Sequence, residues 1–566
     1  ANGGVVKLNN VYSSGNSGGY GLHLGETDTP DSTKSLTITN SQFNWNNFGG
    51  VHALIRGPVS ISNTEISGNW GEDFNEYGDD ATGLYLDNRY LYGAAVTITG
   101  VKANGNMQNG LTILTRGSAT LTNIEAYNNR IAGLVVDSSD GIGNVTINTS
   151  IFNDNESIGL SVLSSRNITL RLVEASNNWG MGAWLDNQSG TGNVTLLGLG
   201  TSGNNFHRNH DTGLWITSAG IVTITNISTD GNRGSGVDVY NVDGLGGVSI
   251  LSASPAWMNT FTWNEGFAGL VITSKGNIRL INVSAWDNSE HGVYLDNCYD
   301  EGAGCTGFGG VTVSSLGTGM VNAFNNNVTA ADLDNYRYSG LYVTSFGSIS
   351  LTNVEASRNG QTGIRLYNNH QNSFGIYSTG NITVNNLTRR EISDNGFIGI
   401  SAISYGNIYI NGVNANNNYI RGGQIGFAYG PVARTITISN SSFNGTRNEP
   451  GLIVAHNGKV TLSSVSANGN DVVDGSIGLW QTVKERINWN NQGQPDTWTY
   501  YGIAETTTVA GGFVSNEFTP VLTVLDYGTF ESPLDPPVLV FDSTTSPNWV
   551  DGQFWFDTEE GHQYEF

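Results

Sequence analysis

Four aspartates stand at one repeated position, four residues after a glycine that opens a short apolar run. A carboxylate there could bind Ca²⁺, which takes oxygen ligands, or could accept a backbone hydrogen bond and close an Asx-type turn. The spacing places the four on alternate repeats, about 9.6 Å apart at twice the strand spacing, so no two can share one cation. We therefore expect turns, with weak Ca²⁺ binding as the alternative and no other cofactor or metal. The residues are Asp87, Asp137, Asp186 and Asp296.

Large aromatic side chains occupy a second repeated position, two residues after the same glycine. Because side chains alternate along a strand, this position points away from the core. A row of exposed rings is unusual on a monomer. Three interpretations stay open: stacking on sugar rings, burial in a protein interface, where Trp and Tyr are enriched, and cover by long neighbouring loops. The rings are Tyr85, Trp184, Trp215, Tyr294, Tyr342 and Trp480, with Trp549 and Trp555 of the C-terminal segment as further interface or glycan-stacking candidates.

The chain has two cysteines, Cys298 and Cys305, within a Gly-rich stretch. A disulfide across a surface loop is the favoured interpretation, and two free thiols are the alternative. No further ligands of a metal site lie nearby in the sequence. A disulfide, low charge and abundant Ser, Thr and Asn are typical of exported proteins, so we expect an extracellular or cell-surface location.

Composition excludes several classes of function. The 566 residues include 24 basic and 48 acidic ones, for a formal net charge of −24, and 76 glycines. So acidic a chain repels phosphate and is a poor partner for nucleic acid or anionic membranes. Abundant Gly and Asn disfavour helices. Because the sequence opens without an initiator Met or a signal peptide, we expect a processed piece of a longer chain.

One phrase recurs along the chain: Gly-apolar-X-apolar, a turn, Gly-Asn-apolar-Thr-apolar, then Asn-apolar-X-Ala and Asn. Each repeat holds three short runs with period-two alternation, which predict strands. A parallel β-solenoid of about 17 coils follows, with equivalent strands about 4.8 Å apart. The glycines that open the phrase, which we call anchor glycines, stand at 21, 50, 83, 110, 133, 159, 182, 213, 236, 269, 292, 340, 363, 399, 423, 451 and 478.

An asparagine stands four residues before ten of the 17 anchor glycines. Stacked amides can hydrogen-bond along a ladder, and Asn tolerates the left-handed backbone of a sharp turn. We predict a structural ladder made of Asn46, Asn106, Asn129, Asn155, Asn178, Asn209, Asn232, Asn288, Asn359 and Asn395.

The repeat resembles the right-handed parallel β-helix proteins of the pectate-lyase-like superfamily, over roughly residues 4–486. The resemblance implies an all-β, right-handed parallel β-helix, but the superfamily includes lyases, hydrolases, tailspikes and adhesins. A Ca²⁺-dependent lyase needs a base beside an Asp cluster, and basic residues are scarce here. Of the polygalacturonase motifs, only Asp79-Asp80 and His291-Gly292 occur, many coils apart and too distant to flank one bond. We therefore assign no catalytic residue, and we lean against an enzyme.

Residues 487–566 depart from the repeat. They hold 12 acidic residues, six of the 11 prolines and no Lys or Arg. Their many aromatic residues argue against a disordered tail. We expect two domains, a β-helix over residues 1–486 and an acidic, aromatic-rich extended or β docking module over residues 487–566.

Two functions from different classes fit these observations. The first is a non-catalytic extracellular structural protein that assembles head to tail with copies of itself into a filament or surface layer, because the repeat begins without a cap and the chain ends in an aromatic module. The alternative is a secreted carbohydrate-binding or polysaccharide-degrading β-helix protein that uses the aromatic row. Neither involves nucleic acid or membrane insertion.

Overall fold

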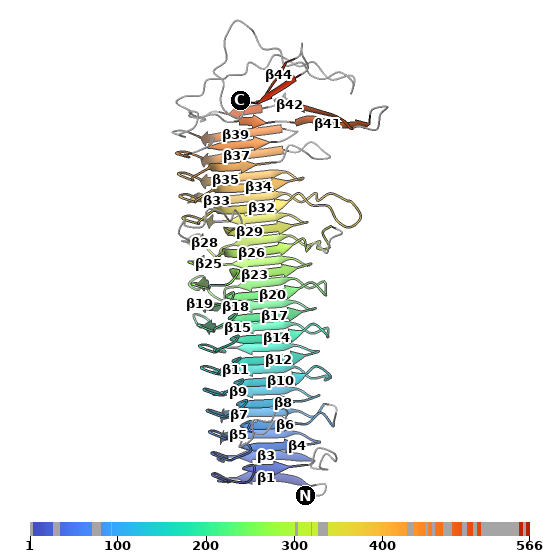
Figure 1. Ribbon diagram of the computed structural model, residues 1–566, viewed down its shortest axis with the longest axis vertical. Helices are drawn as coiled ribbons and strands as arrows, with labels where there is room; N and C mark the ends of the chain where they lie inside the picture. Colours follow the sequence, from blue (N-terminus) through green and yellow to red (C-terminus); the bar gives the residue numbers. More distant parts are fainter. Residues whose placement is uncertain are drawn as a thin grey trace. The chain divides into compact units, whose positions relative to one another are not determined.

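Parallel strands stacked along the chain form the computed structural model of this protein (Figure 1). The structure describes residues 4–25, 34–70, 81–91, 93–299, 304–317, 320–326, 338–426, 435–447, 451–455 and 459–467, and further on the backbone of the strands between 478 and 565. Two compact units divide it: unit 1 comprises residues 1–301 and 306–328, and unit 2 comprises residues 302–305 and 329–566. None of these described residues lies in a helix, so they include no helix able to cross a membrane.

The first sheet of unit 1, which we call the anchor sheet, is formed by the strands at the anchor glycines. Each strand pairs in parallel with the equivalent strand of the next turn. The strands are β2 (Leu22–Leu24), β4 (Val51–Leu54), β6 (Leu84–Asp87), β8 (Leu111–Leu114), β10 (Leu134–Ser138), β12 (Leu160–Ser164), β14 (Ala183–Asn187), β17 (Leu214–Ser218), β20 (Val237–Asn241), β23 (Ala268–Ser274) and β26 (His291–Asn297).

A second parallel sheet follows the turn after each anchor-sheet strand, and a shorter third sheet completes some turns. The second sheet of unit 1 contains β1 (Val5–Asn9), β3 (Ser35–Thr39), β5 (Val59–Glu65), β7 (Val96–Lys102), β9 (Ala119–Thr122), β11 (Val145–Asn148), β13 (Ile168–Arg171), β15 (Val194–Leu197), β18 (Val222–Thr225), β21 (Val248–Leu251), β24 (Ile278–Ile281) and β27 (Val311–Ser314). The third contains β16 (Asn204–His207), β19 (Ile227–Asp230), β22 (Asn259–Thr262), β25 (Val283–Trp286) and β28 (Asn322–Asn325).

Unit 2 repeats this arrangement. Its anchor-sheet strands are β29 (Ser339–Ser345), β32 (Thr362–Asn368), β34 (Ile398–Ser404), β36 (Arg421–Ile425), β38 (Leu452–Ala455) and β40 (Gly478–Trp480). Its second sheet contains β30 (Ile349–Thr352), β33 (Ile382–Glu391), β35 (Ile408–Asn414), β37 (Thr435–Ser442), β39 (Lys459–Ser466) and β43 (Thr507–Ala510), and β31 (Val354–Glu355) is a short third-sheet strand. Two antiparallel pairs follow, β41 (Thr482–Trp489) with β42 (Pro495–Tyr501) and β44 (Phe554–Asp557) with β45 (His562–Glu565).

The core consists of the inward side chains of every strand. In the anchor sheet, Leu111, Leu134 and Leu160 pair in one inward column and are fully buried. The period-two alternation of the sequence therefore gives one apolar stack along the helix axis, with each side chain covered by its equivalents in adjacent turns. No cap or helix is needed between consecutive turns, because each strand supplies the hydrogen-bonding edge for the next.

Each unit contains a ladder of buried asparagines, located in the turns that precede the anchor-sheet strands. The side-chain Nδ2 of Asn106 donates to Oδ1 of Asn129 at 3.0 Å, and the same oxygen accepts the backbone N–H of Asn106 at 3.0 Å. Nδ2 also donates to the main chain, as from Asn129 to the oxygen of Ala103 at 2.9 Å. In unit 1 the ladder links Asn16, Asn46, Asn69, Asn106, Asn129, Asn155, Asn178, Asn209, Asn232, Asn264, Asn288 and Asn326, and in unit 2 it links Asn359, Asn395 and Asn418.

The ladder explains why the anchor residue is glycine. A Cβ added to Gly133 would lie 2.6 Å from the carbonyl oxygen of Gly159 and 2.9 Å from Nδ2 of Asn155. Both atoms belong to the next turn, and one is a ladder amide. A side chain at the anchor position would therefore force adjacent turns apart. Glycine and asparagine recur together because the ladder amide occupies the space that a side chain at the anchor position would need.

Two anchor positions of unit 2 need correction. Gly399 faces Gly422 and not Gly423, since Ile398 pairs with Arg421 and Ile400 with Gly423. The predicted anchor Gly478 pairs with Ile453, two residues beyond Gly451. Gly422 and Gly423 are adjacent in the sequence, and only the strand pairing decides between them.

Candidate functional site

The outward position two residues after each anchor glycine forms one continuous row on the anchor sheet of unit 1, which we call the outer row. Successive members are paired in register, so their backbones lie about 4.8 Å apart. Along the chain the row contains His23, His52, Tyr85, Thr112, Val135, Ser161, Trp184, Trp215, Asp238, Val271 and Tyr294.

Trp184, Trp215 and Asp238 are consecutive members of this row and form the candidate site. Trp184 is 37% exposed, and Trp215 is half-buried. The indole Nε1–H of Trp215 donates to Oγ1 of Thr217 at 3.2 Å, which fixes the ring on its own strand. The next outward residue after Asp238 is Val271, which is only 7% exposed. Trp215 and Val271 therefore flank the carboxyl group of Asp238, and Trp184 lies on the strand beyond Trp215.

Asp238 has an unusual protonation equilibrium. Burial raises its pKa to about 6 from an ordinary 3.8, and burial is the only cause of the shift. A low-dielectric surrounding disfavours the carboxylate when no cation or donor compensates it. Carboxyl groups with strongly perturbed pKa values are frequent at functional sites. At pH 7 the Asp238 side chain is mostly an ionised carboxylate, which accepts hydrogen bonds. Below pH 6 it is mostly protonated and can also donate one.

The other rings of the outer row form separate clusters. Tyr85 stacks on His52 with ring centroids 4.9 Å apart, and His52 stacks on His23 at the same distance. Tyr294 lies against the edge of Phe267 at 5.1 Å. Thr112, Val135 and Ser161 separate Tyr85 from Trp184. Among the predicted rings of unit 1, Trp184 and Trp215 lie on adjacent strands.

The predicted rings of unit 2 have different surroundings. Tyr342 meets the edge of Tyr367 at 5.8 Å, with the guanidinium of Arg365 5.9 Å from its ring centroid. Trp480 pairs with Ala455, the fourth residue after Gly451, so its strand position is not that of the outer row as predicted. The side chains of Trp480 and Trp555 and the whole of Trp549 lie outside the described residues.

The four repeated aspartates close turns. Asp137 accepts hydrogen bonds from the backbone N–H and the hydroxyl of Ser139, at 3.0 and 2.6 Å. Asp186 and Asp296 accept backbone N–H groups two residues later, at 2.9 Å in both cases. Asp87 is buried and forms an ion pair with Arg89 at 2.8 Å. Within the described residues, none of the four belongs to a cluster of three metal-ligating side chains.

Cys298 and Cys305 are both disulfide-bonded, and both are buried. Asp296 supports this segment, because its carboxylate accepts the backbone N–H groups of Cys298 and Tyr299 at 2.9 and 3.0 Å. A disulfide leaves no thiolate for a metal or for nucleophilic chemistry.

The sequence analysis missed Asp238 and His52, although both satisfy the rule that found the tryptophans. Asp238 is two residues after Gly236, and His52 is two residues after Gly50. A row defined by tyrosine and tryptophan does not include an acid or an imidazole at the same position. What the sequence could not reveal is the burial of the Asp238 carboxyl between neighbouring turns.

Comparisons with known proteins address the fold. The family model for the right-handed beta helix region matches residues 82–245, so the predicted right-handed parallel β-helix is confirmed. Two solved structures are similar. The mannuronan C-5 epimerase AlgE6 A-module of Azotobacter vinelandii is 13% identical, with 77% of this chain and 90% of that chain covered and a TM-score of 0.27. Tailspike protein 3 of bacteriophage CBA120 is 9% identical, with 84% and 64% covered and a TM-score of 0.21. No curated protein sequence matches the chain.

Proposed function

We propose that this protein binds a glycan along the outer row of unit 1, with Trp184 and Trp215 as stacking platforms and Asp238 as the polar contact. The observation that carries the proposal is the placement of these three side chains on consecutive paired strands. A pyranose ring has an apolar C–H face and a rim of hydroxyl groups. Exposed indoles suit the face, and a carboxyl group suits the rim.

The spacing of the row suits an extended ligand. Each step along the paired strands is about 4.8 Å, so Trp184 and Asp238 stand about 10 Å apart, near the span of two linked sugar rings. A chain lying along the helix axis would meet an indole, a second indole and then the carboxyl group. Such a sequence of contacts distinguishes a glycan from a small compact ligand.

Binding without hydrolysis is the better account of the acids. Hydrolysis needs two carboxyl groups about 5–10 Å apart across one bond. Asp186 and Asp296 each lie two strands away from Asp238, and each is displaced from it by two residues along the strand direction. Strand geometry then places each Cα atom roughly 12 Å from that of Asp238. Both already accept backbone hydrogen bonds in their turns. Asp238 therefore has no second acid in position on its own sheet.

A titration series tests the proposal. The purified protein is titrated with soluble neutral and acidic hexasaccharides by calorimetry, and the best ligand is repeated with the double variant Trp184→Ala/Trp215→Ala. We expect affinity to fall by about tenfold or more, because each lost ring contact contributes roughly 0.5–1.5 kcal/mol beyond its buried area. Tyr409→Ala is the control, since Tyr409 is an exposed ring of the second sheet. Equal affinity in the double variant would refute the proposal.

Head-to-tail assembly with copies of itself and an extracellular location stay predictions. Electron microscopy of the purified protein at neutral pH tests the first. Fibres would establish assembly as a second function, and separate short particles at high concentration would rule it out. Running the same images on Trp184→Ala/Trp215→Ala separates the two functions, because glycan binding predicts that assembly does not depend on these rings.

A further inference from the structure

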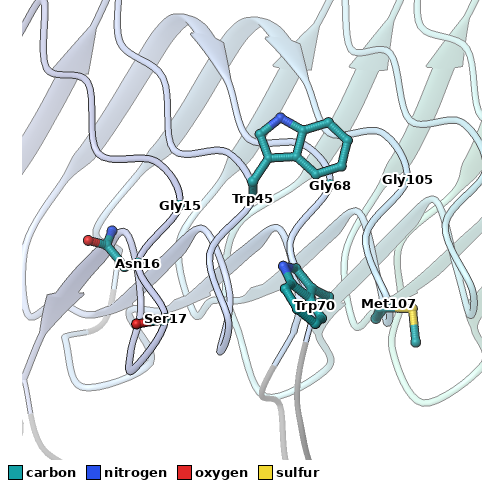
Figure 2. Close-up of a pocket in the computed structure, with 8 residues that line it drawn as sticks. All are labelled: Gly15, Asn16, Ser17, Trp45, Gly68, Trp70, Gly105 and Met107. Carbon is teal, nitrogen blue, oxygen red and sulfur yellow. The ribbon is translucent and has the colours of Figure 1, made fainter.

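A hollow of about 590 Å³ lies beside the asparagine ladder of unit 1, on the side of the unit that we call the ladder edge. Figure 2 shows the side chains of Trp45, Trp70 and Met107 projecting around it. They come from three successive turns, next to the ladder residues Asn46, Asn69 and Asn106. The volume is within the range of about 300–1,000 Å³ typical of small-molecule sites. The remaining lining residues are Gly15, Asn16, Ser17, Gly68 and Gly105.

Trp45 occupies a position that suits a different residue. Its φ is 59°, in the left-handed region, and its side chain is 65% exposed. The neighbouring turns place Gly15, Gly68 and Gly105 at the equivalent point, with φ of 72°, 65° and 64°. A bulky residue in this conformation is strained, and so exposed an indole gains little from burial. Trp45 is therefore the one large side chain at this point of the four turns, beside glycines in the adjacent ones.

The floor of the hollow is flat and held in place. A Cβ on Gly68 would lie 2.6 Å from Cε3 of Trp45, so the indole lies directly on the glycine backbone. The backbone N–H of Trp45 donates to the carbonyl oxygen of Ser67 at 3.1 Å, and the backbone N–H of Trp70 donates to the carbonyl oxygen of Asn46 at 2.9 Å. Trp70 is 51% exposed. Two accessible indoles are thus presented on a backbone that is already hydrogen-bonded.

The chemistry of the lining selects the ligand. None of the residues that line the hollow is ionisable, so the site offers nothing to neutralise an acidic or basic group. It offers aromatic faces, a thioether, and the side-chain oxygen of Asn16 and the hydroxyl of Ser17 at one end. The Nδ2 group of Asn16 already donates to Asn46 at 2.6 Å and to Ser13 at 3.1 Å. We propose that the hollow binds a neutral pyranose unit, stacked on Trp45 and Trp70 with its hydroxyl rim toward Asn16 and Ser17. This second site stands independently of glycan binding at the outer row.

Calorimetric titration with cellohexaose and maltohexaose, with polygalacturonate as the acidic probe, tests the proposal. The variant is Trp45→Asn, because Asn suits the left-handed position. Its matched control is Trp263→Asn, which replaces another exposed tryptophan in the same backbone conformation, with φ of 54°. All titrations are run in the background of Trp184→Ala/Trp215→Ala, so that binding at the outer row does not contribute.

In this background we expect a neutral hexasaccharide to bind, Trp45→Asn to weaken it by about tenfold or more, and Trp263→Asn to leave it unchanged. The thermal midpoint of Trp45→Asn should equal or exceed that of the parent, which separates lost binding from lost folding. Trp70→Ala should weaken binding to a similar degree. Failure of both neutral sugars to bind, equal affinity of Trp45→Asn, or tighter binding of polygalacturonate would each overturn the proposal, whatever the outcome at the outer row.

Discussion

The asparagine ladder and the outer row of the anchor sheet follow the same turns of unit 1, yet they use the repeat in opposite ways. Every ladder turn keeps the same residue, buried in each turn after the first and hydrogen-bonded to its equivalents. The outer row changes residue at almost every turn, from imidazole to indole to carboxyl. The same residue type recurs at positions where adjacent turns must pack closely. At outward-facing positions the residue type can differ from turn to turn, and such differences can create a binding site.

The largest expected effect is on the ladder. Asn155→Ala removes the acceptor for the N–H and Nδ2 of Asn129 and three donated hydrogen bonds, to Ala126, Asn153 and Asn178. Each buried group left unpaired costs about 1–3 kcal/mol, so we expect the free energy of unfolding to fall by about 3–5 kcal/mol. Denaturant unfolding measures it.

The control for Asn155 is Asn148→Ala. Asn148 is half-buried and donates one hydrogen bond, to Thr122 at 3.3 Å. Its loss should lower stability by no more than about 1 kcal/mol. Similar losses in the two variants would mean that the ladder has no special structural role.

The substitution Asp238→Asn should have the next largest effect on stability, and it should stabilise the protein only at high pH. The native pKa of about 6 exceeds the ordinary 3.8, so the folded state retains the proton between these values and wild-type stability falls as pH rises through this window. Above pH 7 the penalty reaches at most about 3 kcal/mol. The asparagine variant lacks this penalty and should have a higher thermal midpoint than wild type at pH 8, with near-equal midpoints at pH 3.5. A pH-independent difference would contradict the assigned pKa.

An anchor-glycine substitution sharpens the comparison further. Gly133→Ala places a Cβ 2.6 Å from the oxygen of Gly159, and such overpacking typically costs about 1–3 kcal/mol. Gly18→Ala is the control, because nothing lies within 4 Å of an added Cβ there. Chemical denaturation should show a clear loss for the first and almost none for the second. Equal effects would argue that the close approach of turns is not what selects glycine.

On the outer row, a single Trp184→Ala should change binding and leave the fold intact. Since this ring is 37% exposed, we expect the free energy of unfolding to change by less than about 1 kcal/mol. The affinity for the glycan should fall severalfold. Trp179→Ala is the matched control, because Trp179 is 68% exposed but lies on the ladder edge, stacked on His210. If Trp179→Ala lowers affinity as much, the binding site is not the outer row.

The smallest effect should come from metal removal. The repeated aspartates accept backbone hydrogen bonds in their own turns, and at least two strand spacings, or about 9.6 Å, separate any two of them. A chelator should therefore leave the thermal midpoint unchanged, and added Ca²⁺ should not raise it. A shift of several degrees with Ca²⁺ would show that the turn assignment overlooks a bound cation.

The sequence predicted what the repeat determines. Period-two runs and anchor glycines predicted the parallel stacking, and the four-residue offset located most of the ladder. The prediction missed Asn16, Asn69, Asn264 and Asn326 because more than four residues separate each of them from the next anchor glycine. It missed Asn418 because the anchor was placed at Gly423 in place of Gly422. Counting along a sequence fails wherever a loop changes length, whereas backbone pairing does not.

The candidate sites were predictable only in part. Trp184 and Trp215 follow from alternation, since an outward position in a strand is readable from the sequence. The raised pKa of Asp238 depends on burial by neighbouring turns. The strain of Trp45 depends on a backbone angle. Neither property belongs to a residue type or a spacing, so both required the three-dimensional structure.

The most direct test of glycan binding at the outer row is a crystal structure of the wild-type protein with its best-binding oligosaccharide. The account predicts sugar rings stacked on Trp184 and Trp215, with a hydroxyl group within hydrogen-bonding distance of Asp238, and the glycan running across successive strands of the anchor sheet. An ordered oligosaccharide bound only elsewhere, with the outer row bare at saturating ligand, would contradict it.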